Sequence, residues 1–203
     1  MVIVPTEKER EDIAAWLSPL NFGKFLADNL NKRTEGTASW IFEDSKLKNW
    51  MNGDLNLLWC PGHPGIGKTM IASVVIDTLT KSKTAIPVLF VFCNYKNHYT
   101  TSNYLKIFLK QLVLQQFVTN NALKLFKDAK AKSRTLSEAD LLNILIEQLQ
   151  KCSKAFIVVD AFDEILDAAI QDDLSHIFTQ ITLNTKVHVM VTSRPHVTNL
   201  DVM

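Results

Sequence analysis

A glycine-rich stretch, "GHPGIGKT" at residues 62–69, ends in a lysine and a threonine. Its Gly62, Gly67, Lys68 and Thr69 fit the pattern G-x-x-x-x-G-K-[ST] of a phosphate-binding loop. Glycines let successive backbone N–H groups converge on one oxyanion, and the helix that follows adds its positive N-terminal dipole. Lys68 would reach the β- and γ-phosphates of a nucleotide, and the Thr69 hydroxyl would ligate Mg²⁺. The stretch is therefore predicted to hold a polyphosphate.

The candidate nucleotide-binding residues form one continuous run: Gly62, His63, Pro64, Gly65, Ile66, Gly67, Lys68, Thr69 and Met70. An apolar "NLLWC" precedes the run, and "KTMIASVVIDTL" follows it with apolar residues at helical spacing, which indicates a strand-to-helix turn. The alternative is an ordinary turn, rich in glycine and proline, that caps the helix. His63 occupies a variable position of the loop, and we interpret it as a spacer rather than a catalytic group.

A second group of candidates follows the apolar run at 156–159 in "AFIVVDAFDE". Asp160 ends this buried strand, where it is predicted to hold the Mg²⁺ shell, because a charge there would be costly without the metal. Asp163 and Glu164 follow within four residues, and one of them is predicted to orient the attacking water. The alternative for this acidic pair is N-terminal capping of the next helix, and the two roles are compatible.

A third candidate, Arg194, follows the alternating valines of "VHVMVTSRP". Because Pro195 stops the strand, Arg194 is expected where the sheet meets the ligand. Its fork-shaped cation would contact the γ-phosphate and report its loss on hydrolysis. A structural ion pair with Asp160 or Asp163 is the competing role.

The elements that must position these residues alternate from residue 54 onward. Apolar patterns predict strands at 55–60, 88–93, 155–160 and 186–192, and helices at 68–82, 103–117, 138–151 and 170–182. Such alternation predicts an α/β fold of three layers, with a mostly parallel sheet between helices. The nucleotide would then lie beyond the carboxyl ends of the strands.

Capping patterns mark further helices. Thr6 with Glu9 predicts the start of a first helix, with Trp16 and Leu17 on its buried face, and Ser137 with Asp140 caps the helix at 138–151. "WIFED" is predicted to be extended and to lead into a short helix that begins at Asp44 or Ser45 and ends near Gly53. The basic stretch 123–135 is interpreted as a solvated helix or loop face.

Composition limits the partners of the chain. It has 203 residues, 47% of them hydrophobic, and a net charge of +1 with a pI near 7.7. This balance gives no reason to expect nucleic acid or an anionic membrane as the main partner. The longest apolar runs are too short to span a bilayer, and the polar N-terminus does not resemble a signal peptide. Three scattered cysteines favour reduced thiols and a cytoplasmic location.

Taken together, "GHPGIGKT", "VVDAFDE" and "VTSRP" resemble a NACHT domain of the STAND class of P-loop NTPases. The sequence is most similar to the nephrocystin-like type of fungal NOD-like receptor proteins. In "VVDAFDE", the small Ala161 after the aspartate, then Phe162 and two acids, is typical of NACHT proteins. The resemblance also implies that the region around Arg33, Gly36 and Thr37 lies near the base and ribose.

The resemblance implies two units, an N-terminal helical segment at 1–53 that packs on the core and a NACHT-type NTPase domain at 54–203. In that family a helical domain, a winged helix and repeats normally follow, whereas this sequence continues for eight residues beyond Pro195. We therefore expect a domain truncated after its last strand. The family also has a strand beside the one that precedes the phosphate loop, so that the edge of "NLLWC" is expected to be exposed unless the N-terminal segment covers it. An exposed edge favours self-association.

The leading hypothesis is a Mg²⁺-dependent NTPase that hydrolyses ATP or GTP slowly as a signalling switch in fungal immunity or self/non-self recognition. Its catalytic candidates are Lys68, Asp163, Glu164 and Arg194, and its metal ligands are Thr69 and Asp160. The alternative is an oligomerisation module that binds nucleotide without significant hydrolysis. A small-molecule kinase is disfavoured because no arginine-rich lid is present, and a Ras-like GTPase because N-K-x-D is absent.

Overall fold

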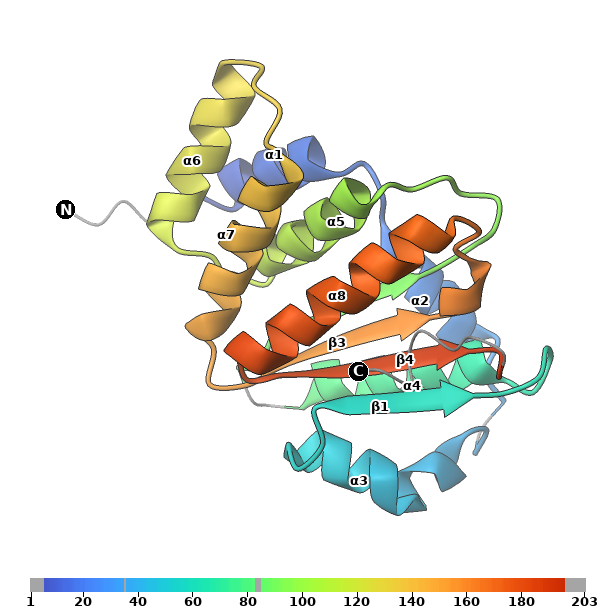
Figure 1. Cartoon of the computed structure of the whole chain (residues 1–203). Helices are drawn as coiled ribbons and strands as arrows, with labels where there is room; N and C mark the ends of the chain where they lie inside the picture. The colour runs from blue at the N-terminus through green and yellow to red at the C-terminus, as the bar shows by residue number, and fades with distance from the viewer. Residues whose placement is uncertain (1–5, 35, 83–84, 196–203) are drawn as a thin grey trace.

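A four-stranded parallel sheet forms the centre of the computed structural model, which describes residues 6–34, 36–82 and 85–195. The strands are β1 (Leu57–Pro61), β2 (Val88–Phe92), β3 (Ala155–Asp160) and β4 (Val187–Ser193), in the spatial order β1-β4-β3-β2 (Figure 1). All three pairings are parallel, as predicted, and every strand lies within two residues of its expected bounds.

Helices cover both faces of the sheet (Figure 1). They are α1 (Glu7–Leu17), α2 (Phe22–Asn31), α3 (Ser45–Asn52), α4 (Lys68–Lys81), α5 (Thr101–Leu114), α6 (Asn120–Ala131), α7 (Glu138–Gln150) and α8 (Ala168–Asn184). Two 3₁₀ turns complete the described part, η1 (Ser39–Glu43) and η2 (Phe162–Glu164). The three-layer α/β/α fold inferred from the alternation of elements is confirmed.

The strand residues divide between two cores because successive side chains of a strand point to opposite faces. Ile157, Val159 and Val191 pack with α5, α7 and α8, whereas Val158 and Met190 pack with α3 and α4. All five side chains are buried. Burial on both faces explains why β3 is apolar from Ala155 to Val159.

The N-terminal residues pack onto the sheet layers as helices. Thr6 forms the predicted capping box with Glu9, and Ile13 and Leu17 bury α1 against α5. The short helix α3 begins after Asp44 and ends at Gly53, as predicted, and Gly53 adopts a φ of 100° that glycine tolerates. The division into units at residue 53 stays a prediction, and residues 196–203 lie outside the described part.

Two elements differ from the sequence-based expectation. "WIFED" is not extended but forms the 3₁₀ turn η1, because Asp44 at its end caps α3 and the turn tightens before that cap. The basic stretch 123–135, by contrast, forms the expected solvated helix face: most of it belongs to α6, whose Lys124 and Lys130 are exposed while Leu123 and Phe126 are buried. Helix α2 was not predicted, although its Phe22, Phe25, Leu26 and Leu30 fall at helical spacing and none of its residues is fully buried.

The two edges of the sheet differ in how their backbone hydrogen-bonding groups are covered. The outer edge of β2 is capped by two glutamine side chains, one in α5 and one at its C-cap. Gln111 bonds both the N–H and the C=O of Phe90, and Gln115 bonds both groups of Val88. Strand β1, as predicted, lies at the other edge, and no described strand pairs with its outer side. Helix α3 packs against β1, and Pro61, which lacks an N–H, ends this edge strand.

Candidate functional site

The predicted phosphate loop connects β1 to α4 at the carboxyl end of the sheet. Gly65 and Gly67 have φ values of 81° and 94°, a region that disfavours residues with a Cβ. At Gly62 an added Cβ would lie 2.2 Å from the Cδ1 of Ile66, whose exposed side chain could turn away. The requirement for glycine therefore rests on backbone conformation at Gly65 and Gly67.

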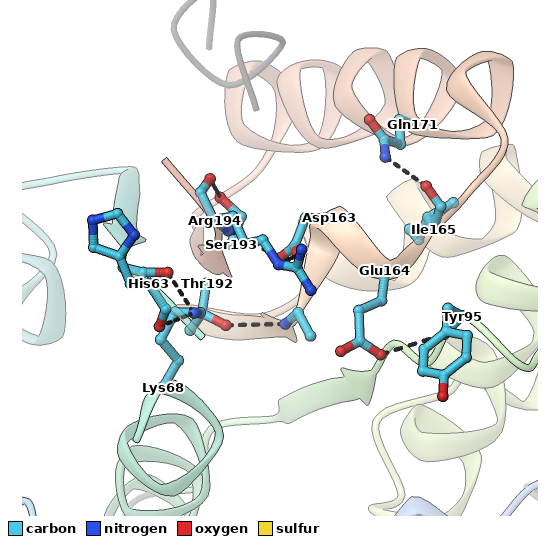
Figure 2. Close-up of polar contacts among 12 residues, drawn as sticks. His63, Lys68, Tyr95, Asp163, Glu164, Ile165, Gln171, Thr192, Ser193 and Arg194 are labelled. Carbon is cyan, nitrogen blue, oxygen red and sulfur yellow. Dashed lines mark hydrogen bonds and ion pairs between the residues drawn. The ribbon is translucent and has the colours of Figure 1, made fainter. Parts of the chain in front are cut away.

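Lys68 folds back onto its own loop. Its Nζ donates to the carbonyl oxygen of Gly62 at 2.5 Å and to that of His63 at 3.0 Å (Figure 2). The loop thus holds its cation at the mouth of the turn, bonded only to neutral carbonyls. The His63 side chain is exposed and points away from Asp163 and Glu164, in keeping with a spacer (Figure 2).

Asp160 ends β3 in a buried position, with 2% of its surface exposed. Burial raises the pKa of its carboxyl, and hydrogen bonds from Thr192 and Thr69 oppose that rise. The Thr192 hydroxyl donates to Asp160 Oδ1 at 2.6 Å and accepts from the backbone N–H of Ala161 at 3.0 Å. Thr192 was not among the predicted site residues. The feature of the sequence that could have indicated it is a hydroxyl residue that directly follows the alternating valines of β4.

The donor set around Asp160 suits a hard cation. The Asp160 carboxylate and the Thr69 hydroxyl hydrogen-bond each other, so one ion could contact both oxygens. No group of three His, Cys, Asp or Glu residues is placed to hold a metal in the described ranges. Mg²⁺ at phosphate sites commonly uses only one or two protein ligands besides water and phosphate. Thr69 and Asp160 therefore fit Mg²⁺.

The two acids after β3 point in different directions. Residue Ala161 adopts the left-handed conformation with a φ of 55°, and η2 follows. Asp163, whose side chain is 6% exposed, accepts the Arg194 backbone N–H with Oδ1 at 3.0 Å and pairs with Arg194 Nε through Oδ2, also at 3.0 Å. Glu164 accepts the backbone N–H of Tyr95 at 3.3 Å, on the other side (Figure 2).

The ion pair considered for Arg194 as its competing role is present in the structure, with Asp163 as the partner. The next residue back, Ser193, accepts the indole N–H of Trp59 and donates to the carbonyl of Arg194, which ties the end of β4 to β1. Among the described residues, nothing bonds the two terminal nitrogens of the Arg194 guanidinium.

A hollow of about 320 Å³ gathers most of the predicted site. It is lined by Pro64, Gly65, Gly67, Lys68, Thr69, Ala161, Asp163, Glu164 and Arg194. Asp160 lies buried behind it, and Gly62, His63, Ile66 and Met70 belong to the loop but not to the lining. Arg33 and Thr37 do not line it either: Arg33 Nε bonds the Thr37 carbonyl. Their predicted place near the base stays a prediction.

The parallel sheet, the glycine loop after β1 and the acids after β3 define the fold as that of P-loop NTPases. The Cdc6p structure from Pyrobaculum aerophilum shares this fold, with a TM-score of 0.56 and 13% identity over all of this chain and 48% of its own. Orc1 of Aeropyrum pernix, solved in complex with DNA, aligns with a TM-score of 0.49 and 18% identity over all of this chain and 43% of its own.

The family is shown by sequence. Residues 36–194 match the family model described as the N-terminal region of nephrocystin 3, and the chain belongs to this family. It is also 40% identical over 55 residues to the vegetative incompatibility protein HET-E-1 of Podospora anserina, a match that spans 27% of this chain and 4% of that protein. The resemblance to nephrocystin-like NACHT domains is thereby confirmed. None of the helices in the described part combines the length and apolar character of a membrane span.

Proposed function

We propose that the chain is a Mg²⁺-dependent nucleoside triphosphatase that acts on ATP or GTP. The observation that carries this proposal is the hollow in which Lys68, Thr69, Glu164 and Arg194 converge from three separate segments. Binding of phosphate needs only the loop, whereas hydrolysis also needs an acid and a γ-phosphate contact. Both kinds of group line the hollow.

The loop residues would bind the phosphates. Open space surrounds the Cα atoms of Gly65 and Gly67, so their backbone can approach an anion closely. Lys68 would exchange the carbonyls of Gly62 and His63 for phosphate oxygens, a gain because the partner is then charged. Thr69 and Asp160 would hold Mg²⁺, which neutralises charge on the phosphate oxygens when bound.

We assign the orientation of water to Glu164 rather than Asp163. Both oxygens of Asp163 are engaged by Arg194, whereas only one oxygen of Glu164 has a partner among the described residues, the N–H of Tyr95. Asp163 is then the residue that positions Arg194. With Nε held by Asp163, the terminal nitrogens of Arg194 would contact the γ-phosphate.

Turnover should be slow, because Arg194 is the only arginine that lines the hollow in the described part of the chain and its Nε is already paired. An arginine supplied by a second molecule would accelerate hydrolysis. Slow turnover suits a switch. The family, and the likeness to a protein named for vegetative incompatibility, support a NACHT-type role in fungal self/non-self recognition or NOD-like immunity, in the cytoplasm.

The test measures phosphate release with Mg²⁺ and ATP or GTP, and nucleotide affinity in parallel. Lys68→Ala should lose both. Glu164→Gln should lower the release rate by about 10²-fold or more while binding is kept. Asp163→Asn should affect hydrolysis less, because the amide oxygen can still accept the Arg194 N–H. Equal rates for the wild type and Glu164→Gln would refute the catalytic assignment.

A nucleotide-dependent oligomerisation module without significant hydrolysis is the second candidate. The unpaired outer edge of β1 favours it, since such an edge can pair with another chain. Tight binding that depends on Lys68, without phosphate release but with a nucleotide-dependent increase in molecular mass, would support this candidate. Sedimentation velocity with and without nucleotide measures that increase.

A further inference from the structure

A second hollow lies between α1, α5, α6 and α7 and shares no lining residue with the nucleotide site. We name it the basic hollow. Its volume is about 340 Å³, and its polar or aromatic lining residues are Trp16, Lys106, Lys130, Ser133, Arg134 and Thr135. Three cations and two hydroxyl groups thus face one cavity whose lining contains no carboxylate.

The cations of the basic hollow form no ion pair with a described carboxylate. Neither Lys106 nor Arg134 takes part in the salt bridges of the described residues. Lys130 donates to a main-chain carbonyl, that of Asp12, rather than to a carboxylate. Asp140 lies within electrostatic reach of Arg134, but its carboxylate caps the backbone N–H of Ser137. Positive charge is therefore left for a ligand.

The fold holds these groups in place. Helix α6 ends with Ser133 in the left-handed conformation, at a φ of 49°, and the Arg134 N–H bonds back to the Ala129 carbonyl at 2.9 Å. This is the closing bond of a Schellman motif, which fixes where the Arg134 side chain begins. The bond from Lys130 to Asp12 joins α6 to α1. The cation of Lys130 is therefore held by a bond to α1, and the main chain that carries Arg134 is ordered.

An adjoining hollow of about 370 Å³ extends the positive surface. It shares Arg134 with the basic hollow and adds Lys124 and Lys132, with Asp128 as the only carboxylate in its lining. The whole chain has a net charge of only +1, so this concentration of cations is local. A local cluster around a cavity favours a compact ligand over a long polyanion, which would need an extended basic track.

We propose that the basic hollow binds a compact anion that carries several phosphate groups. An arginine fork matches phosphate geometry, lysines add point charges, and hydroxyls donate to the remaining oxygens. Three cations around one cavity require a ligand with more than one negative group. Such a ligand occurs free in solution or as the headgroup of an inositol lipid, and the experiment separates the two sources.

The experiment uses the whole chain and inositol hexakisphosphate as the soluble probe. Titration calorimetry should show saturable binding, and the fluorescence of Trp16, which lines the hollow, should change unless Trp16→Phe is present. The variant Lys106→Gln/Arg134→Gln should bind at least about a hundredfold more weakly, since each lost charge-assisted bond costs about tenfold or more. The matched control Lys24→Gln/Lys186→Gln removes two exposed lysines that do not line the hollow and should bind like the wild type.

A second arm tests the lipid source with vesicles of phosphatidylcholine, with and without phosphatidylinositol bisphosphate. Co-sedimentation that needs the inositol lipid and is lost in Lys106→Gln/Arg134→Gln identifies a headgroup site. Binding of the soluble probe alone identifies a free ligand. The proposal is overturned if neither probe binds, if the two double variants bind equally, or if Lys68→Ala abolishes binding, because the phosphate loop would then be the site. Thermal unfolding of each variant verifies that it is folded.

Discussion

Thr192 is the residue whose replacement tests the structure most directly. Its hydroxyl is fully buried, donates to the Asp160 carboxylate and accepts from the Ala161 N–H. Thr192→Val keeps the shape but removes both bonds. A hydrogen bond to a charged group contributes about 1.5–3 kcal/mol, and an orphaned buried N–H costs about 1–3 kcal/mol. Because Asp160 can take up a proton in response, we expect a net loss of about 3 kcal/mol.

The assay is thermal and urea unfolding without nucleotide or Mg²⁺. A loss of that size corresponds to a decrease in Tm of about 6–12 °C for a domain of this length. Thr192→Ser keeps the hydroxyl and serves as the control. In the background of Asp160→Asn, the effect of Thr192→Val should be smaller, because the charged partner is already gone. If Thr192→Val were as stable as Thr192→Ser, the reasoning from these two bonds would be wrong.

Three further perturbations test other parts of the structure. Gln111→Leu/Gln115→Leu exposes the backbone of β2, so light scattering should reveal association that rises with protein concentration. The control Gln180→Leu, on the exposed face of α8, should not associate in this way. Equal light scattering by the two variants would show that the amides do not protect the edge. Burial lowers the pKa of His188 below its ordinary 6.5, so below that pH the unfolded chain binds a proton that the folded chain resists. The free energy of unfolding should therefore fall as the pH drops from about 6.5. His188→Gln should remove the contribution of His188 to this pH dependence, measured as the urea midpoint at each pH. An unchanged pH dependence would count against the assignment of the effect to His188. Burial raises the pKa of Cys60 to about 11, so alkylation near neutral pH should be slow in the native protein and fast in urea, and fast native labelling followed by mass spectrometry would contradict this.

The sequence predicted the sheet because buried parallel strands leave an unmistakable apolar pattern. Asp160 and Arg194 were placed at strand ends for the same reason, since β3 and β4 end in polar residues after apolar runs. Motif spacing located the phosphate loop, in which Gly65 and Gly67 have positive φ. These features depend on residues that are neighbours in the chain, and so a single sequence contains them.

Features that depend on long-range contacts were missed. The contact of helix α2 with α4, where Asn29 donates to the Ser73 hydroxyl, joins residues 44 positions apart, and no residue of α2 is fully buried. The bonds of Gln111 and Gln115 to β2 join residues that are 21 and 27 positions apart. Nothing in the local sequence of α5 distinguishes these two glutamines from exposed ones.

The different partners of Asp163 and Glu164 show how topology separates two adjacent acids of a motif. Strand β3 lies between β4 and β2, so a turn that follows it has the end of β4 on one side and the end of β2 on the other. Successive residues of a 3₁₀ turn point about 120° apart, because the turn has three residues. Asp163 therefore meets Arg194 after β4, and Glu164 meets Tyr95 after β2. The motif contains two adjacent acids, and the strand order brings one to Arg194 and the other to Tyr95, while both line the hollow.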